Sequence, residues 1–398
     1  MKERIGIVFT IVVFAVYIYF YKPIVRENNL KVIDEENISA EIVHRGFIGA
    51  VDFVYDDEEN LYIAYKDRIQ FVNNKGYSKT VFKDKNLEIA SLEYSKDKLY
   101  FSSACSIYEY DINEKIQKEI IKNLPNKGDY KESIIEWKNN YLYISIGSAT
   151  NSGVVGDDNK WNKEQVKNCD VSPKDIKLKG TNFQGHSTGA FVPYKNKNIK
   201  GAIIKGNTPG NSSILIYNLN TKAMETYAWG IRNIKGMDFN SEEKLIVSVG
   251  GMEDRGLRPI KNDVDYLYDI KKNEWYGFPD YTGGDPVNSP RFQKEDSQIQ
   301  NFILEEHPNY NPPAPIYQHE SLNSISKLVV DKNGVLGETD SIYFYDEKEN
   351  KILKYTKNNI LIDIIEFSEV KVSNIKIFKE FVYILDKKLG IIYRLSRK

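Results

Sequence analysis

Apolar and polar residues alternate along most of this 398-residue chain, and one alternating pattern returns six times. Each copy begins at a polar turn and continues into a short strand of aliphatic and aromatic residues. Alternation with a period of two residues is typical of a half-buried β-strand and not of a helix. The six copies are NLYIAY from Asn60, KLYFSS from Lys98, YLYISI from Tyr141, KLIVSV from Lys244, SIYFYD from Ser341 and FVYILD from Phe381.

The spacing of these copies predicts how they are arranged. An apolar strand precedes each copy, as VDFVY precedes the first and NIKIF the last. The aliphatic second residue of each copy recurs after 38, 43, 103, 97 and 40 residues, and the short intervals match a β-propeller blade of roughly 40–50 residues. Because one blade cannot bury its apolar face alone, we expect a single all-β, six-bladed propeller over residues 43–398. A set of unrelated hairpins and a seventh blade hidden in a long interval are the alternatives.

The two long intervals indicate where a functional site would lie. Each contains roughly 50 residues more than a blade needs, rich in Gly, Asn and Asp and without strand alternation. Propellers bind ligands in loops at the mouth of their central channel, because the blades hold those loops rigidly. We therefore expect a site, if the protein has one, between Ser145 and His319.

The N-terminal segment has a different pattern. Residues Ile5–Tyr21 carry no charge, and as a helix they would span about 25 Å, near the short end for crossing a bilayer. Lys2 and Arg4 precede them, so the positive-inside rule places the rest of the chain outside the cytoplasm. We expect a transmembrane anchor over residues 1–22 and a tether over 23–42, which makes this a single-pass protein of the cell membrane. A cleaved signal peptide is the alternative, although no small-residue cleavage site follows.

Charge and cysteine content narrow the class of protein further. The chain has 55 Lys plus Arg against 56 Asp plus Glu, and such a balance argues against a nucleic-acid partner. Its 28 tyrosines suit strands, because aromatic rings pack well on a pleated surface. Two cysteines are too few for a disulfide scaffold. Cys105 and Cys169 either pair outside the cell or remain separate small residues.

Several distinctive motifs lie in and around the long intervals. They are GSATNSGVVGDDN from Gly147, AWGIRNIKGMDF from Ala228, EDRGLRPIKNDVDYLYDI from Glu253, NEWYGFPDYTGGDPV from Asn273 and FILEEHPNYNPPAPIYQH from Phe302. Together, and in this order, they resemble the glucose/sorbosone dehydrogenase family. The resemblance covers roughly residues 45 to 330 and is densest between Ala228 and Pro290. It implies a six-bladed propeller that oxidises a sugar or related alcohol with pyrroloquinoline quinone and calcium.

The resemblance also implies a cofactor site. The family's cofactor-binding Arg-Asn pair falls on Arg232 and Asn233, and arginine offers a planar fork for carboxylates of the quinone. The alternative is that Arg232 holds a loop through backbone carbonyls. The family's calcium-binding turn falls on Gly250 and Gly251, and calcium prefers oxygen ligands such as backbone carbonyls. The neighbouring acids are candidate ligands of a second, structural calcium, or else belong to a solvated acidic loop; they are Glu253, Asp254, Asp263 and Asp265.

The chain departs from the family at the catalytic base. Active members use a histidine just before the third blade, because a histidine titrates near working pH. Here that region reads LPNKGDYKESIIEW from Leu124, without a histidine, and Asp129 and Tyr130 take the approximate position. The candidate bases are therefore Asp129 and His186, the second of which lies in the first long interval.

The sequence says less about the roles of the remaining histidines and of several aromatic residues. His44, His307 and His319 are expected to be structural. The aromatic cluster near the same mouth either stacks on a sugar or packs the edge of a blade; its members are Trp229, Trp275, Tyr276, Phe278 and Tyr281.

Two functions therefore stand side by side. One is a membrane-anchored dehydrogenase of a sugar or another small molecule, and the other is a non-catalytic propeller that binds carbohydrate or a partner protein at the cell surface.

Overall fold

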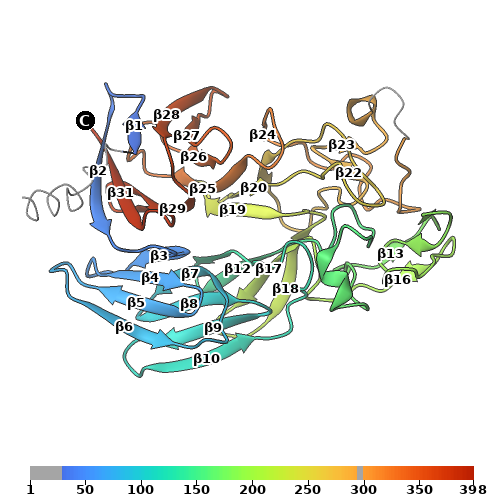
Figure 1. The fold of residues 1–398 in the computed structure, drawn as a ribbon, viewed down its shortest axis with the longest axis horizontal. Helices are drawn as coiled ribbons and strands as arrows, with labels where there is room; N and C mark the ends of the chain where they lie inside the picture. The colour runs from blue at the N-terminus through green and yellow to red at the C-terminus, as the bar shows by residue number, and fades with distance from the viewer. Residues whose placement is uncertain (1–28, 294–298) are drawn as a thin grey trace, which may run out of the picture.

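The computed structural model describes residues 29–293 and 299–398, and they form the expected all-β, six-bladed propeller. Each blade is an antiparallel sheet with its first strand at the central channel (Figure 1). The expected transmembrane segment, residues 1–22, lies outside the described residues. Within the described ranges there is no helix with the length and apolarity needed to cross a membrane.

The first three blades follow one another in chain order. Blade 1 consists of β3 (Asp52–Tyr55), β4 (Leu61–Tyr65), β5 (Arg68–Val72) and β6 (Ser78–Lys83). Blade 2 consists of β7 (Ile89–Ser95), β8 (Lys98–Ser103), β9 (Ser106–Asp111) and β10 (Ile116–Ile121). Blade 3 consists of β11 (Ile135–Lys138), β12 (Tyr141–Ile146), β17 (Ser213–Asn218) and β18 (Met224–Trp229).

The other three blades complete the ring. Blade 4 consists of β19 (Ile234–Phe239), β20 (Leu245–Val249), β21 (Tyr266–Ile270) and β24 (Tyr317–Gln318). Blade 5 consists of β25 (Ile325–Asp331), β26 (Ser341–Asp346), β27 (Lys351–Tyr355), β28 (Leu361–Phe367) and the added β1 (Leu30–Val32). Blade 6 consists of β29 (Val372–Phe378), β30 (Phe381–Asp386), β31 (Ile391–Arg397) and β2 (Ile38–Arg45).

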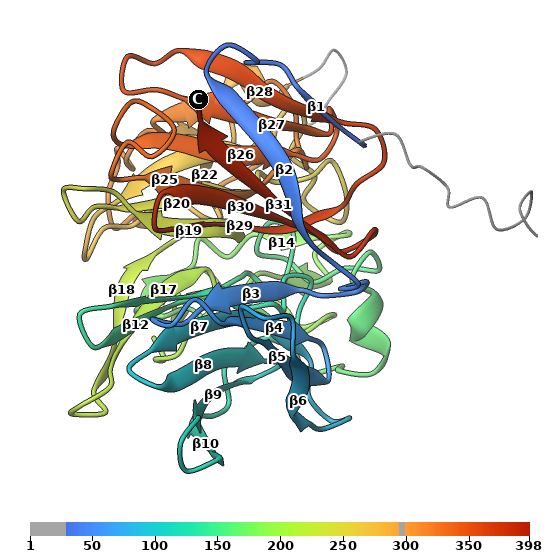
Figure 2. The same cartoon turned by 90° about the vertical axis from the view of Figure 1, so that its left-hand side faces the viewer.

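The ring closes by pairing the two ends of the described chain. Strand β2 runs antiparallel to β31, with Ile38 opposite Arg397 and Ile42 opposite Tyr393 (Figure 2). The part of the expected tether from residue 30 to residue 42 thus belongs to the propeller, as β1 and most of β2. Both are outer strands whose side chains are mostly half-buried. The alternate apolar residues do pack against the core, as Leu30 and Val32 in β1 and Ile38, Ala40 and Ile42 in β2, but each alternation is too short to stand out from the charged residues around it.

Aspartates link the inner strands of neighbouring blades. Asp52 on β3 accepts a hydrogen bond of 2.7 Å from the backbone N–H of Leu92 on β7. Asp238 on β19 accepts one of 2.8 Å from the backbone N–H of Val330 on β25. Both carboxylates are almost completely buried. Each therefore adds a buried hydrogen bond between two blades that are otherwise held together by apolar side-chain packing.

The blade connections determine where the long intervals lie. The turn between the second and third strands of a blade and the loop before the next first strand lie at the same end of the propeller, because neighbouring strands are antiparallel. We call this end the insertion face. It carries the first insertion (residues 147–212) and the β20–β21 loop (residues 250–265), with residues 271–316, the second insertion, beside them. These segments lie on the side of the molecule away from β1, β2 and the C-terminus (Figure 1).

Short elements order these segments. The first insertion contains η1 (Lys160–Lys163), β13 (Ile176–Lys177), β14 (Asn182–Phe183), β15 (Thr188–Gly189) and β16 (Ile203–Ile204). The described part of the second insertion contains β22 (Tyr281–Thr282), β23 (Asp285–Pro286) and η2 (Pro290–Phe292).

Candidate functional site

Arg232 lies at the insertion face, immediately before β19, and its guanidinium is enclosed by protein. Its side chain is 3% exposed. Its Nε donates to the backbone carbonyl of Asn151 at 2.8 Å, and Nη2 donates to the Asn151 side-chain oxygen at 2.8 Å. Its Nη1 donates to the carbonyl of Gly250 at 3.2 Å. Arg232 thereby joins the first insertion to the β20–β21 loop.

A carboxylate and a phenol complete the surroundings of this arginine. Glu253 Oε1 lies 3.2 Å from Arg232 Nη2 and accepts a hydrogen bond of 2.8 Å from the Tyr130 hydroxyl. The Tyr130 hydroxyl also contacts Arg232 Nη2, and the guanidinium carbon lies 4.4 Å from the centre of the Tyr130 ring. Burial raises the pKa of Tyr130 to about 12, so the phenol stays protonated and acts as a donor at neutral pH.

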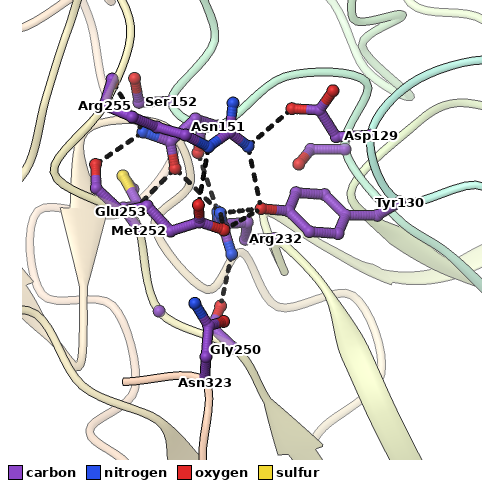
Figure 3. Close-up of polar contacts among 12 residues, drawn as sticks. Asp129, Tyr130, Asn151, Ser152, Arg232, Gly250, Met252, Glu253, Arg255 and Asn323 are labelled. Atoms are coloured by element: carbon purple, nitrogen blue, oxygen red, sulfur yellow. Dashed lines mark hydrogen bonds and ion pairs between the residues drawn. The ribbon is translucent and has the colours of Figure 1, made fainter. Parts of the chain in front are cut away.

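A second arginine occupies the centre of a carboxylate cluster (Figure 3). Arg255 Nε donates to Glu253 Oε2 at 2.7 Å, and Nη2 donates to Asp129 Oδ2 at 2.7 Å. Its Nη1 donates to Asp158 Oδ2. Burial alone would raise the pKa of Glu253, but Arg232 and Arg255 together hold it below its usual range. We call Asp129, Asp158, Glu253 and the two arginines the arginine network.

Asp129 is a member of this network, and both of its carboxylate oxygens are engaged by donors of the protein. Besides Arg255, it accepts a hydrogen bond of 3.0 Å from the side chain of Asn159 and one of 2.7 Å from the indole N–H of Trp161. These donors occupy both carboxylate oxygens. Asp129 therefore holds the first insertion against the loop before β11, and its geometry does not favour the role of a general base.

His186, the other candidate base, lies elsewhere. It is exposed at the tip of the β14–β15 hairpin, in a left-handed conformation with φ of 68°. It lines a hollow of about 870 Å³ together with Leu257, Pro259 and Phe292. Asp129 lines a different cleft, so the structure does not bring the two candidate bases together.

Two of the candidate calcium ligands, Gly250 and Glu253, are engaged by arginines. The Gly250 carbonyl accepts from Arg232, and both oxygens of Glu253 accept from arginines. Asp254 is exposed to solvent. Position 251 accommodates only glycine, because a Cβ there would lie 2.1 Å from the backbone carbonyl oxygen of Val264. No group of three His, Cys, Asp or Glu side chains in the described part of the chain is arranged to hold a metal ion.

The same contacts decide whether the residues present fit a quinone. A tricarboxylate needs cationic and amide donors that face an open site. The Arg232 donors instead point to protein oxygens in a closed environment, and the carbonyl of Asn233 accepts the backbone N–H of Gly250 at 2.9 Å. The residues as they are arranged do not fit the cofactor, although the residues that the resemblance implies do gather in one place.

An open cleft of about 940 Å³ lies beside the arginine network. Its lining combines hydrogen-bond donors and acceptors of several kinds with two aromatic rings. The residues that face it from the network and the surrounding loops include Asn126, Lys127, Asp129, Tyr130, Lys160, Trp161, Gln165 and Arg255.

The sequence interpretation missed a buried hub between the β20–β21 loop and the second insertion. Arg258 and Asp280 form an ion pair of 2.8 Å in which both side chains are fully buried. Asp280 also accepts from the backbone N–H groups of Ile303 and Leu304 and contacts His307 Nε2 at 3.0 Å. The acidic loop is thus not solvated throughout, and His307 has the structural role that the sequence predicts. Arg258 lies in the motif from Glu253 and Asp280 in the motif from Asn273, but nothing in either motif indicates that the two side chains pair.

The other sequence candidates pack within the protein. His319 is buried and contacts Asp346 at 3.1 Å. The aromatic cluster is buried, with every member at most 8% exposed, which favours the packing interpretation over sugar stacking; its members are Trp229, Trp275, Tyr276, Phe278 and Tyr281. Cys105 and Cys169 are free thiols.

Comparisons with known proteins support the fold. No family model and no curated protein matches the sequence. Among solved structures, the chain is similar to a carbohydrate-active enzyme of family AA12 from Trichoderma reesei, with 13% identity over 93% of this chain and 98% of that one and a TM-score of 0.63. It is similar to the PQQ domain of pyranose dehydrogenase from Coprinopsis cinerea, with 11% identity over 92% and 97% of the two chains and a TM-score of 0.61.

A bacterial neighbour has the same architecture. The PQQ-bound aldose sugar dehydrogenase from Streptomyces coelicolor shares 12% identity over 91% of this chain and 98% of that one, with a TM-score of 0.56. The six-bladed propeller that the resemblance implies is therefore confirmed at the level of the fold. Fold does not determine function, so activity has to be argued from the residues of this chain.

Proposed function

We propose that this protein is a membrane-anchored propeller outside the cytoplasm, and that it binds a sugar or another hydroxyl-rich small molecule without oxidising it. One observation supports the proposal most strongly. An open, polar cleft lies directly beside the arginine network, whose Arg232 is itself enclosed by protein. The cleft of about 940 Å³ is large enough for a small oligosaccharide fragment. Arg232, which the resemblance assigns to the cofactor, is buried beside it and satisfied by protein acceptors.

The cleft lining suits hydroxyl groups. A sugar hydroxyl both donates and accepts hydrogen bonds, so it pairs with amides, carboxylates and ammonium groups together. Gln165, Glu164 and Lys160 provide such groups around the cleft. Trp161 adds an aromatic ring, whose N–H is already engaged by Asp129, so that its apolar surface remains for the C–H face of a sugar.

The absence of a suitable base among the described residues supports binding over oxidation. Hydride removal from an alcohol needs a base within hydrogen-bond reach of the hydroxyl. Asp129 is occupied by three donors, and His186 lines a separate hollow. The uncharged segment Ile5–Tyr21 supports the anchor.

The test uses the full-length protein in detergent. Thermal-shift and intrinsic-fluorescence titrations with neutral, acidic and amino sugars should give a saturable response to at least one class. Trp161→Ala should weaken the affinity about fivefold, because a stacked aromatic contact is worth about 1 kcal/mol. Tyr77→Ala provides the control, since Tyr77 is an exposed aromatic residue on blade 1, outside the cleft. A binding response that is unchanged in Trp161→Ala would exclude the cleft.

Sugar oxidation with pyrroloquinoline quinone and calcium is the second candidate. The observation that favours it is that Tyr130, Arg232 and Gly250 meet at one point, as the resemblance implies. Incubation of the full-length protein with quinone and calcium, followed by cofactor absorbance and dye reduction with aldoses, separates the two candidates. Quinone binding at micromolar concentration with dye reduction would replace the binding proposal by this one.

A further inference from the structure

Three consecutive aliphatic residues are exposed at the outer rim of blade 5. Ile360, Leu361 and Ile362, at the start of β28, are 54%, 40% and 37% exposed. Strand β1 pairs with β28 only between Ile365 and Phe367, so among the described residues no strand lies beyond the start of β28. Open edges of this kind usually carry charged residues that keep other chains away. A contiguous apolar run at such an edge indicates an interaction surface.

Two further isoleucines extend this run. The backbone N–H of Ile33, the residue after β1, donates to the carbonyl of Ile364 at 2.9 Å. The carbonyl of Ile316 accepts a hydrogen bond of 2.8 Å from the hydroxyl of Tyr355, which is the partner of Leu361 in the sheet. Both isoleucine side chains are exposed. We call the five exposed residues the rim patch; they are Ile33, Ile316, Ile360, Leu361 and Ile362.

The charged residues beside the rim patch are paired with one another. Lys351 lies 2.7 Å from Asp363, and Lys357 lies 2.9 Å from Asp340. The patch is therefore apolar and has no excess of one charge at its border. Such a surface favours the apolar boundary of a bilayer over an anionic polymer, which would need unpaired cations.

The sequence that precedes the described chain brings a bilayer close to this rim. The carbonyl of Asn29 accepts a hydrogen bond of 3.1 Å from the backbone N–H of Ser368, directly after β28. Tyr21, the last residue of the charge-free segment, is eight residues before Asn29, and eight residues span at most about 28 Å. A bilayer that contains the charge-free segment thus lies within about 28 Å of the end of β28. The rim patch begins at the other end of the same strand, about 23 Å away.

We propose that blade 5 lies on the outer surface of the membrane and inserts the rim patch into the lipid interface. This proposal rests on the membrane anchor of the proposed function. Strand β10 of blade 2 lies on the opposite side of the ring from β28 (Figure 2). Loops of blade 2 and the first insertion line the cleft beside the arginine network. Seating through blade 5 therefore leaves the cleft open to a soluble ligand.

Quenching by spin-labelled lipid tests the proposal. The full-length protein, with Cys105 and Cys169 replaced by serine, carries the fluorophore NBD on Ile362→Cys and is reconstituted as one copy per lipid nanodisc. Nitroxide groups near the top of the acyl chains should quench this label at least about twofold, because an inserted residue lies within about 5–10 Å of that depth. The matched control is Ile116→Cys on β10, where the isoleucine is 48% exposed, and its label should not be quenched. Ile360→Cys replaces Ile362→Cys if that variant does not fold.

The outcomes separate the seating from the anchor. Equal quenching at the blade 5 and blade 2 positions overturns the proposal. A label on blade 5 whose emission changes only when several copies share one membrane indicates contact between copies, and this result also overturns it. Flotation of the unlabelled full-length protein with liposomes tests the anchor alone. A protein that does not float loses the anchor and the seating together, whereas one that floats without selective quenching keeps the anchor and loses the seating.

Discussion

The buried Arg258–Asp280 pair should be the most sensitive point of the insertion face. Both side chains are fully buried, and Nη2 of Arg258 lies 2.8 Å from Oδ1 of Asp280. Arg258 also donates to the carbonyl oxygens of Ser152, Pro279 and Asn301. One guanidinium thus connects the first insertion with two parts of the second.

The loss of stability on removing Arg258 can be estimated from the Asp280 carboxylate that remains buried. Arg258→Met retains most of the side-chain volume but leaves the Asp280 carboxylate buried without its cation. Breaking a buried pair from one side costs about 3–5 kcal/mol, mainly because the remaining charge is not compensated. Three backbone carbonyls also lose their donor, so we expect the upper part of this range.

Removing the second charge should recover part of the loss. In the double variant Arg258→Met, Asp280→Asn no unpaired charge is buried, and the new amide oxygen can still accept from the N–H groups of Ile303 and Leu304. We expect the double variant to be more stable than Arg258→Met alone by about 1–3 kcal/mol.

Urea unfolding followed by tryptophan fluorescence measures the free energy of unfolding of the wild type, of Arg258→Met and of the double variant. The matched control is Arg68→Met, which removes a partly exposed pair of 2.9 Å and should cost less than about 1 kcal/mol. A cost below about 1 kcal/mol for Arg258→Met, or a double variant that is less stable than the single one, would refute the role of this pair.

Three further perturbations test other parts of the molecule. Glu253→Gln should lower stability by about 1–3 kcal/mol in urea unfolding, because it removes the carboxylate shared by Arg232 and Arg255; no change would mean that the network is not a stabilising unit. Burial raises the pKa of Asp170 to about 6, so the folded state binds its proton more tightly than the unfolded state. The stability of the wild type relative to Asp170→Asn should therefore fall by about 2–3 kcal/mol between pH 4 and pH 7; a rise would contradict the assignment. Ile38→Asp places a charge in the buried closure strand β2 and should lower stability by at least about 3 kcal/mol, whereas Glu41→Gln on the exposed side of that strand should not.

The repeat made the blades predictable, but not the closure of the ring. The aliphatic landmarks Leu61 and Leu245 are buried at blade interfaces, and their strands are buried on both faces, so each forms a short apolar run that a sequence shows clearly. Strand β2 also alternates, with Ile38, Ala40 and Ile42 packed against the core. This alternation covers only five residues, lies among charged residues and lacks the aliphatic–tyrosine landmark of the repeat, so it was not recognised as a strand.

At the site, residue types were predictable and their partners were not. Arg232, Gly250 and Glu253 do come together, as the resemblance implies. Arg255 and Asp158 were missed because they meet only through the folding of two separate loops, 97 residues apart in sequence. An arginine that faces a ligand and an arginine that faces its own protein look alike in a sequence, and the difference depends on which acceptors reach it first.

That competition explains why the same positions can support different functions on one propeller. A donor such as Arg232 has a fixed number of N–H groups, and each one used by a protein carbonyl is lost to a ligand. In this chain Asn151 and Gly250 take three of those hydrogen bonds, and Glu253 compensates the charge. A ligand would have to displace all of these contacts in a buried environment before it gained any interaction of its own. The adjacent cleft demands no such displacement, and for this reason a ligand is better sought there than at the arginine.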